Sequence, residues 1–484
     1  MGGQNNNSKK TQKTNKNITQ KTEKTVADKT SANFPERLKK HFPLSFIIAF
    51  VFDLIYGCLY YSQYNAIDLY DTASFSMAGE TLATGKLDLL RTPVYPLFLH
   101  FCSKSPIEDT NRLVVTIQII IFYISIWFFY QLLAQFTSNP VLKAAGTIFY
   151  GCMTPVIAFN FLMLTESFTV SGSVFFCYLL VLAIKKRRIS YYTICIFLAL
   201  FMTMLRPSEL YLFVVIAITA VPFISDLLRK KTETKKQLYL IPLAAFLICI
   251  ASLFGYMSLN KRHNNYYGLS YVSEMNRFYD VVQADIWRDN SDTEIVNALQ
   301  ENLDAGNTLL GAALEVEPSF RNVDIKPDRI PDFNSKAISN HRSEYVYYLA
   351  RKVLNMGYNH MEYNLSNDSY FFKDDANTKI LWLGDLLDFN INFLYFIFLV
   401  TAIIIIAAVI KKKQILWPEL TASLIIGGLL AVNILAGPAE FHRLNAPCYP
   451  FAIMLLISWA GAACDNACRL TKRKSTDGSK KDTV

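Results

Sequence analysis

Long uninterrupted apolar runs recur along this chain, and they constrain its fold more than any other feature. A helix needs about 20 such residues to cross a hydrocarbon core of about 30 Å. Runs of this kind must be helical, because in lipid every backbone amide needs a partner within the protein. The sequence is 52% hydrophobic and 18% charged, whereas soluble domains are about 25% charged. We therefore predict an all-α, multi-pass membrane protein.

We expect about ten transmembrane helices. They lie near residues 44–62, 112–135, 141–159, 163–184, 189–205, 208–228, 237–259, 387–410, 416–436 and 446–464. Basic residues precede the first span and follow the fourth, sixth, eighth and tenth, at 185–188, 229–236, 411–413 and 472–474. Positive charge marks the cytoplasmic side. Both termini are thus expected in the cytoplasm of a cell whose plasma membrane holds the chain, and an odd error in the count would break this agreement.

The spans divide the chain into segments of different character. A Lys-, Asn- and Thr-rich tail is too polar to form a core and should be disordered. The long polar segment should fold as an extracytoplasmic cap, with helices near 293–303 and 340–357, because a structureless loop of this length would be unusual. The expected segments are a basic cytoplasmic tail at 1–43, a transmembrane module at 44–259 with a first outer loop at 63–111, the cap at 260–386, C-terminal transmembrane helices at 387–465, and a basic cytoplasmic tail at 466–484.

Charge and cysteine usage exclude other functions. The net charge of +9 gathers in the tails and beside apolar runs, where it orients helices and meets anionic membrane lipids, so we do not expect nucleic-acid binding. The nine cysteines show no C-x-x-C pair or metal-ligand spacing, which favours packing roles.

Carboxylates and arginines gather on the predicted outer side. Asp71 lies just before an amphipathic, interfacial helix, where it is either a helix N-cap or a general base. Glu166 opens the fourth span, either as a functional acid or as a first-turn residue favoured by the helix dipole. Arg91, Arg206 and Arg443 lie on the face that the positive-inside rule depletes.

Arginine is the natural partner of phosphate and of carboxylate. The three arginines could therefore form structural bridges to Asp71, Glu80, Glu166 and Glu440. Alternatively, they could hold the phosphate of a lipid-linked substrate while a carboxylate activates an incoming hydroxyl.

The first outer loop resembles a known signature. Asp71-x-x-x-Phe75, Ala78, Leu82 and Gly85, followed by Arg91-Thr-Pro-Val-Tyr-Pro-Leu-Phe-Leu, resemble the first loop of bacterial GT-C glycosyltransferases of the protein O-mannosyltransferase and aminoarabinose transferase branch. Further similar stretches occur in order at Leu164-Thr165-Glu166, Arg206-Pro207, 260–270, 341–352 and His442-Arg443 with Pro447. The chain departs from the pattern at Phe75, where Tyr is common, and at His442-Arg443-Leu444, which replaces an Arg-Tyr pair.

This resemblance implies an inverting transfer of a sugar from a polyprenyl-phosphate donor to an acceptor hydroxyl on the extracytoplasmic side. The acceptor would be a glycan, a lipid or a protein. Asp71 would be the catalytic base, Glu166 would assist it, and Arg91, Arg206 and Arg443 would bind the donor phosphate. Asp68, Glu80 and His442 are possible supporting residues. Some GT-C members use a divalent metal, and Asp68 with Asp71 could hold one, but we see no full ligand set and expect no metal or other cofactor.

Two other functions stay open. A surface-polysaccharide polymerase or ligase also has many spans and outer arginines, but would normally lack the loop signature around Asp71. A non-enzymatic transporter would place polar groups near the middle of the bilayer, where Asp53 in the first span is the main example. A transporter would use Asp53 as an ion site, whereas otherwise it pairs with another buried polar group.

Overall fold

The computed structural model describes residues 42–65, 70–228, 236–324, 326–355, 372–373, 376–387, 391–412, 415–437 and 441–478. Within these ranges the protein consists of helices and connecting loops, and one isolated bridge pairs Tyr64 with Phe372. The predicted all-α class is confirmed. The tail predicted to be disordered lies outside the described residues, apart from its last two.

Eight helical segments in the described part of the chain are long and apolar enough to cross a membrane. They belong to α3 (Leu44–Gln63), α6 (Thr110–Leu133), α9 (Glu166–Lys186), the succession η2 (Pro207–Leu210), α11 (Tyr211–Thr219) and α12 (Val221–Leu228), α13 (Lys236–Asn264), α20 (Ile391–Lys412), α21 (Trp417–Ala436) and α23 (Tyr449–Gly478). Each corresponds to a predicted span.

The other two predicted spans are present in altered form. The third is a broken pair, in which α7 (Pro140–Cys152) is followed by α8 (Thr154–Ile157) and η1 (Ala158–Asn160) at a bend of 59°. Pro155 lies in the first turn of α8, where its missing N–H costs nothing, so it favours a new helix after the break. The fifth is α10 (Ile189–Leu205), with 17 residues, which packs between α9 and α13.

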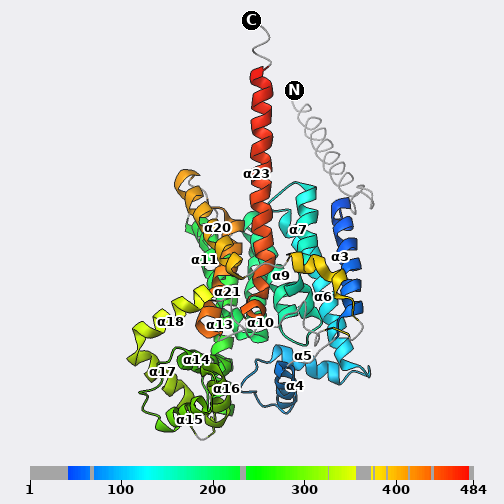
Figure 1. Cartoon of the computed structure of the whole chain (residues 1–484). Helices are drawn as coiled ribbons and strands as arrows, with labels where there is room; N and C mark the ends of the chain where they lie inside the picture. The colour runs from blue at the N-terminus through cyan, green and yellow to red at the C-terminus, as the bar shows by residue number, and fades with distance from the viewer. Residues whose placement is uncertain are drawn as a thin grey trace, which may run out of the picture.

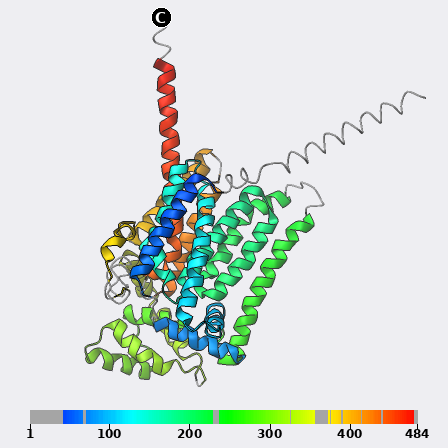
Figure 2. The same cartoon turned by 90° about the vertical axis from the view of Figure 1, so that its right-hand side faces the viewer.

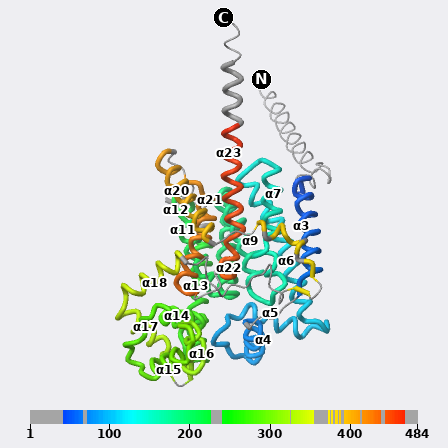
Figure 3. The backbone as a smooth tube through the Cα atoms, in the orientation of Figure 1, coloured from blue at the N-terminus to red at the C-terminus, as the bar shows by residue number. Residues whose placement is uncertain are grey.

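The two ends of the helix bundle differ. At one end lie α4 (Tyr70–Ala83), α5 (Val94–Ser103) and the cap helices, whereas α23 projects from the other end (Figure 1). The view turned by 90° shows the same separation (Figure 2). The short helix α22 (Phe441–Leu444), which precedes α23, lies at the end that carries the cap (Figure 3). Loops that are distant in sequence are thereby brought together.

The cap has a hydrophobic core of its own. Five helices surround fully buried side chains that include Phe278, Trp287 and Phe333. These helices are α14 (Val272–Gln283), α15 (Thr293–Asp304), α16 (Leu309–Phe320), α17 (Arg329–Asn340) and α18 (Arg342–Asn355). Helices α15 and α18 match the two stretches predicted to be helical, although α18 begins only after the break at His341.

Candidate active site in the first loop

Asp71 lies in the first turn of α4, which begins at Tyr70. The predicted N-cap position is therefore wrong, because the helix starts two residues earlier than an N-cap at Asp71 would require. A carboxylate in the first turn is still favoured by the helix dipole. The helix ends at Ala83, and the turn after it contains Gly85, whose φ of +82° belongs to the left-handed region that glycine adopts without strain.

Helix α4 packs closely on α5. A Cβ added at Gly79 would lie 2.5 Å from the carbonyl oxygen of Pro96, so the two helices can approach this closely only because that residue has no side chain. Phe75 of α4 and Tyr95 of α5 form an edge-to-face contact at 5.1 Å between ring centroids. The loop signature around Asp71 and Arg91 is thus folded into a compact pair of helices.

Arg91 is held directly against the acid. Its Nη2 donates to Asp71 Oδ1 at 2.5 Å, and its Nε donates to Ser74 Oγ at 2.9 Å. The guanidinium also lies over the ring of Phe75, 4.2 Å from the centroid. Phe75, a departure from the family's usual Tyr, therefore supplies an aromatic face for the arginine. Ser74 was not predicted from sequence.

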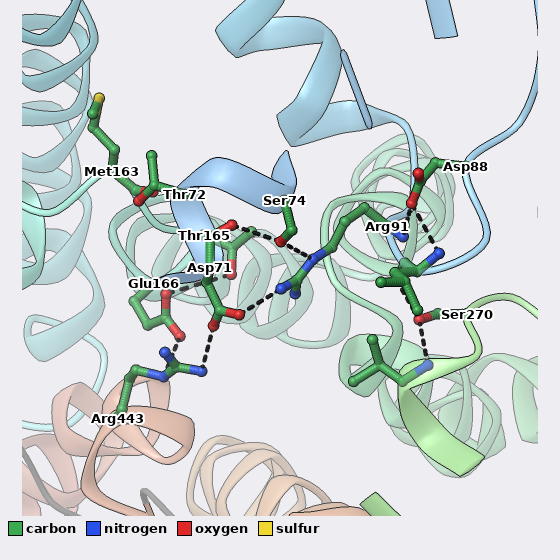
Figure 4. Close-up of polar contacts among 12 residues, drawn as sticks. Asp71, Thr72, Ser74, Asp88, Arg91, Met163, Thr165, Glu166, Ser270 and Arg443 are labelled. Carbon is green, nitrogen blue, oxygen red and sulfur yellow. Dashed lines mark hydrogen bonds and ion pairs between the residues drawn. The ribbon is translucent and has the colours of Figure 1, made fainter. Parts of the chain in front are cut away.

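A second arginine reaches the same acid from the far end of the chain. Arg443 Nη2 lies 2.9 Å from Asp71 Oδ2, and its Nε lies 3.4 Å from Glu166 Oε1. Arg206 Nη1 lies 3.6 Å from the same Glu166 oxygen. Figure 4 shows Arg91 on one side of the Asp71 carboxylate, and on the other side Arg443, whose guanidinium contacts both Asp71 and Glu166. The residues form one continuous network in the order Arg91, Asp71, Arg443, Glu166 and Arg206.

This acid–arginine network is largely withdrawn from solvent. The arginine side chains are 12% to 17% exposed, Glu166 is 3% exposed and Asp71 is 29% exposed. Burial by itself would raise the pKa of Asp71, but the charges and hydrogen bonds of Arg443 and Arg91 outweigh it and lower the pKa to about 2. With each of its oxygens bound to a guanidinium, Asp71 is a weak base in this arrangement.

An irregular buried segment positions Glu166. The predicted span at 163–184 becomes helical only at Glu166, and the buried residues 161–165, between η1 and α9, are not helical. Gln118 of α6 fixes this segment, because its Nε2 donates to the carbonyls of Asn160 and Leu162, each at 3.0 Å. The hydroxyl of Tyr95 donates to Gln118 Oε1 at 3.0 Å, and so connects the segment to α5.

Gln118 and Glu209 were missed from sequence. Gln118 is fully buried in an apolar span, and an isolated amide in such a span is the signal that could have found it. Glu209 is also fully buried, on η2, where it interacts electrostatically with Arg206 and with Glu166. It lies three residues after Arg206, so the Arg-Pro motif could have pointed to it.

Of the other candidate residues singled out in the sequence, only Glu80 and Asp53 have described side chains, and neither joins the network. Asp68 and Glu440 lie outside the described residues, and so does the side chain of His442. Glu80 is exposed, and it follows Asp71 by nine positions on α4, which places it on the opposite face of the helix. Asp53 is buried on α3, where Cys152 Sγ donates to its Oδ1 at 3.5 Å.

No group of three or more His, Cys, Asp or Glu side chains with metal-binding geometry occurs among the described residues. The candidate partner Asp68 lies outside them, so metal independence stays a prediction.

Comparison with known proteins confirms the predicted resemblance over one part of the chain. Residues 91–255 match the model of a family described as dolichyl-phosphate-mannose-protein mannosyltransferase. The match includes Arg91, Glu166 and Arg206, whereas Asp71 and Arg443 lie outside it.

No curated protein matches the chain. Among solved structures, it is similar to the archaeal oligosaccharyltransferase AglB from Archaeoglobus fulgidus in complex with an inhibitory peptide and a dolichol-phosphate, with 10% identity and a TM-score of 0.45. The alignment covers 90% of this chain and 52% of that one, so this chain spans about half the length of the archaeal protein.

Proposed function

We propose that the protein transfers a sugar from a polyprenyl-phosphate donor to an acceptor hydroxyl, with inversion at the anomeric carbon and with Asp71 as the general base. The observation that carries the proposal is the network itself, in which Asp71 lies between Arg91 and Arg443. A base next to two guanidinium groups is what such a displacement needs, because the acceptor hydroxyl loses a proton while negative charge develops on the leaving phosphate.

The arginines are the proposed phosphate ligands. Planar guanidinium groups bind phosphate oxygens through paired hydrogen bonds. Arg91, Arg206 and Arg443 come from three separate parts of the chain, yet all belong to the one network. A phosphate diester entering there would compete with Asp71 and Glu166 for the same N–H groups.

This competition gives a mechanism in which the donor frees the base. When the phosphate draws Arg91 and Arg443 away, Asp71 regains lone pairs and the pKa of its carboxyl rises because burial remains. Asp71 then takes the acceptor proton, the acceptor oxygen bonds to the anomeric carbon, and the bond from that carbon to the phosphate oxygen breaks with its electron pair on the phosphate. The products are the glycosylated acceptor and polyprenyl phosphate. Glu166, held by Arg443 and Arg206, would orient the acceptor.

The side of the membrane follows from the charge pattern. Helix α4, which contains Asp71, lies at the end of the bundle that carries the cap helices (Figure 1). The basic clusters of the sequence predict that this end is extracytoplasmic. We therefore propose a plasma-membrane enzyme with both termini in the cytoplasm. A glycan, lipid or protein acceptor would approach from the extracytoplasmic side.

The test is incubation of the purified protein with a panel of polyprenyl-phosphate sugars, followed by assay for free polyprenyl phosphate and for a glycosylated acceptor. The wild-type protein should release polyprenyl phosphate from one donor, and Asp71→Asn should abolish release while inserting normally. The matched control is Glu108→Gln, an exposed acid of the same loop, which should keep full activity. Full activity in Asp71→Asn would remove the proposed base. A transporter would move a substrate without releasing polyprenyl phosphate, and a polymerase or ligase would act on glycan chains instead of single sugars.

A further inference from the structure

The loop that precedes Arg91 is bound to the cap. Asn264, the last residue of α13, donates through Nδ2 to the carbonyl of Leu87 at 3.1 Å. The Ser270 hydroxyl donates to the carbonyl of Leu90 at 2.5 Å, and the backbone N–H of Tyr271 donates to the carbonyl of Leu89 at 3.0 Å. Three hydrogen bonds thus hold the main chain of the four residues before Arg91.

The loop is also fixed from within. Asp88 Oδ1 accepts hydrogen bonds from the backbone N–H groups of Leu90, at 2.8 Å, and of Arg91, at 2.7 Å. The side chains of Leu89 and Leu90 pack against the hydrophobic core of the cap. These contacts fix the position of the Arg91 backbone, from which its side chain extends to Asp71.

Ser270 is the central contact. Its side chain is 5% exposed, and its hydroxyl meets the peptide group immediately before Arg91. In Figure 4, Ser270 and Asp88 lie on either side of this stretch, and the Arg91 guanidinium extends from it to Asp71. Whether that guanidinium binds Asp71 or a donor phosphate, the backbone from which it extends is held by hydrogen bonds to the cap.

We propose that Ser270 and Asn264 are positioning residues, through which the cap sets the reach of Arg91 toward the donor phosphate. This inference rests on the proposed function. It gives the cap a part in donor binding, in addition to any influence on the acceptor from its position at the same end of the bundle as α4 (Figure 1). The cap contact acts on donor affinity, because the arginine that it anchors is a phosphate ligand rather than the base.

The experiment measures steady-state kinetics with the full-length protein and the polyprenyl-phosphate sugar that it uses. Losing one hydrogen bond weakens positioning by about five- to tenfold. Ser270→Ala should raise the donor KM by that factor, with kcat and the acceptor KM nearly unchanged. Asn264→Ala, which removes a different contact to the same loop, should act in the same direction. The matched control Ser339→Ala removes an exposed hydroxyl that bonds only within α17 and should leave all three constants unchanged.

Repeating both substitutions in an Arg91→Ala background distinguishes positioning of Arg91 from a purely structural role of Ser270 and Asn264. If Ser270 and Asn264 act through Arg91, they should change the donor KM little once Arg91 is gone, because interacting residues are not additive. An equal rise in the donor KM with and without Arg91, or no rise in either variant, would overturn the inference. An unchanged donor KM in Arg91→Ala alone would instead refute the phosphate role of Arg91, and with it the basis of the inference.

Discussion

The proposed release of Asp71 by the donor predicts a specific dependence of the rate on pH. In the structure, burial alone would raise the pKa of Asp71, but Arg443 and Arg91 outweigh it and hold the pKa at about 2, below the usual aspartate value of 3.8. This difference corresponds to about 2 kcal/mol of stabilisation of the ionised form. Because the folded-state pKa is depressed, the contribution to stability is present above about pH 4 and is lost as the pH falls toward 2.

Donor binding should reverse the direction of this shift. Once the two guanidinium groups hold phosphate, burial is the remaining influence on Asp71, and burial raises the pKa of a carboxyl group. The acidic limb of kcat should therefore lie above pH 4, whereas kcat/KM for the donor, which reports the free enzyme, should show no limb from Asp71 down to that pH. The phosphate of a polyprenyl-phosphate sugar is a diester and does not titrate in this range.

The assay is the release of polyprenyl phosphate between pH 4 and 8, with donor concentration varied at saturating acceptor. Glu166→Gln serves as the control, because a limb that belongs to Asp71 persists in that variant even when the rate falls. Identical acidic limbs for kcat and for kcat/KM would refute the exchange of partners at Asp71.

Three further substitutions test other parts of the structure. Gln118→Leu leaves two buried carbonyls without their amide donor, so we expect a loss of about 2 kcal/mol in stability and a lower kcat, measured by thermal unfolding and by turnover. Arg443→Lys cannot bridge Asp71 and Glu166 with one planar group, so it should raise the donor KM about tenfold while expression is kept. Lys352→Met leaves Asp280 buried without a charge partner that lies 2.7 Å away, and should destabilise the cap by about 3–5 kcal/mol, seen as faster proteolysis of the cap.

The fold was predictable because it depends on local composition. Apolar runs long enough to cross a bilayer must be helical, which yielded the spans corresponding to α3, α6, α9 and the others. The break between α7 and α8 was not predicted, because the run at 141–159 stays apolar through the bend. The start of α9 at Glu166 was missed for the same reason. Hydrophobicity indicates burial, and a buried irregular segment is as apolar as a helix.

The sequence predicted the five charged residues of the acid–arginine network, but not which carboxylate contacts which arginine. Successive spans cross the membrane in opposite directions, so the segments between them alternate between its two sides. This alternation alone predicted that Asp71, Glu166 and the arginines lie on the same side. Which carboxylate meets which arginine depends on how α22 and η2 approach α4, and no local pattern encodes that approach. The contacts of Gln118 and Ser270 go to backbone carbonyls, which leave no trace in the sequence of the accepting residues.

The ion pairs within the acid–arginine network affect the order in which donor and acceptor can bind. Both Asp71 oxygens are bound to guanidinium groups, so an acceptor hydroxyl that arrives first meets no free base. A donor that arrives first removes the guanidinium groups and creates the acceptor subsite. We therefore expect ordered binding with the donor first. An acceptor analogue that cannot react should then inhibit uncompetitively against the donor, because it binds only the donor complex. A competitive or mixed pattern would show that the acceptor binds without the donor, and the arginines would then have to leave Asp71 for a reason other than phosphate.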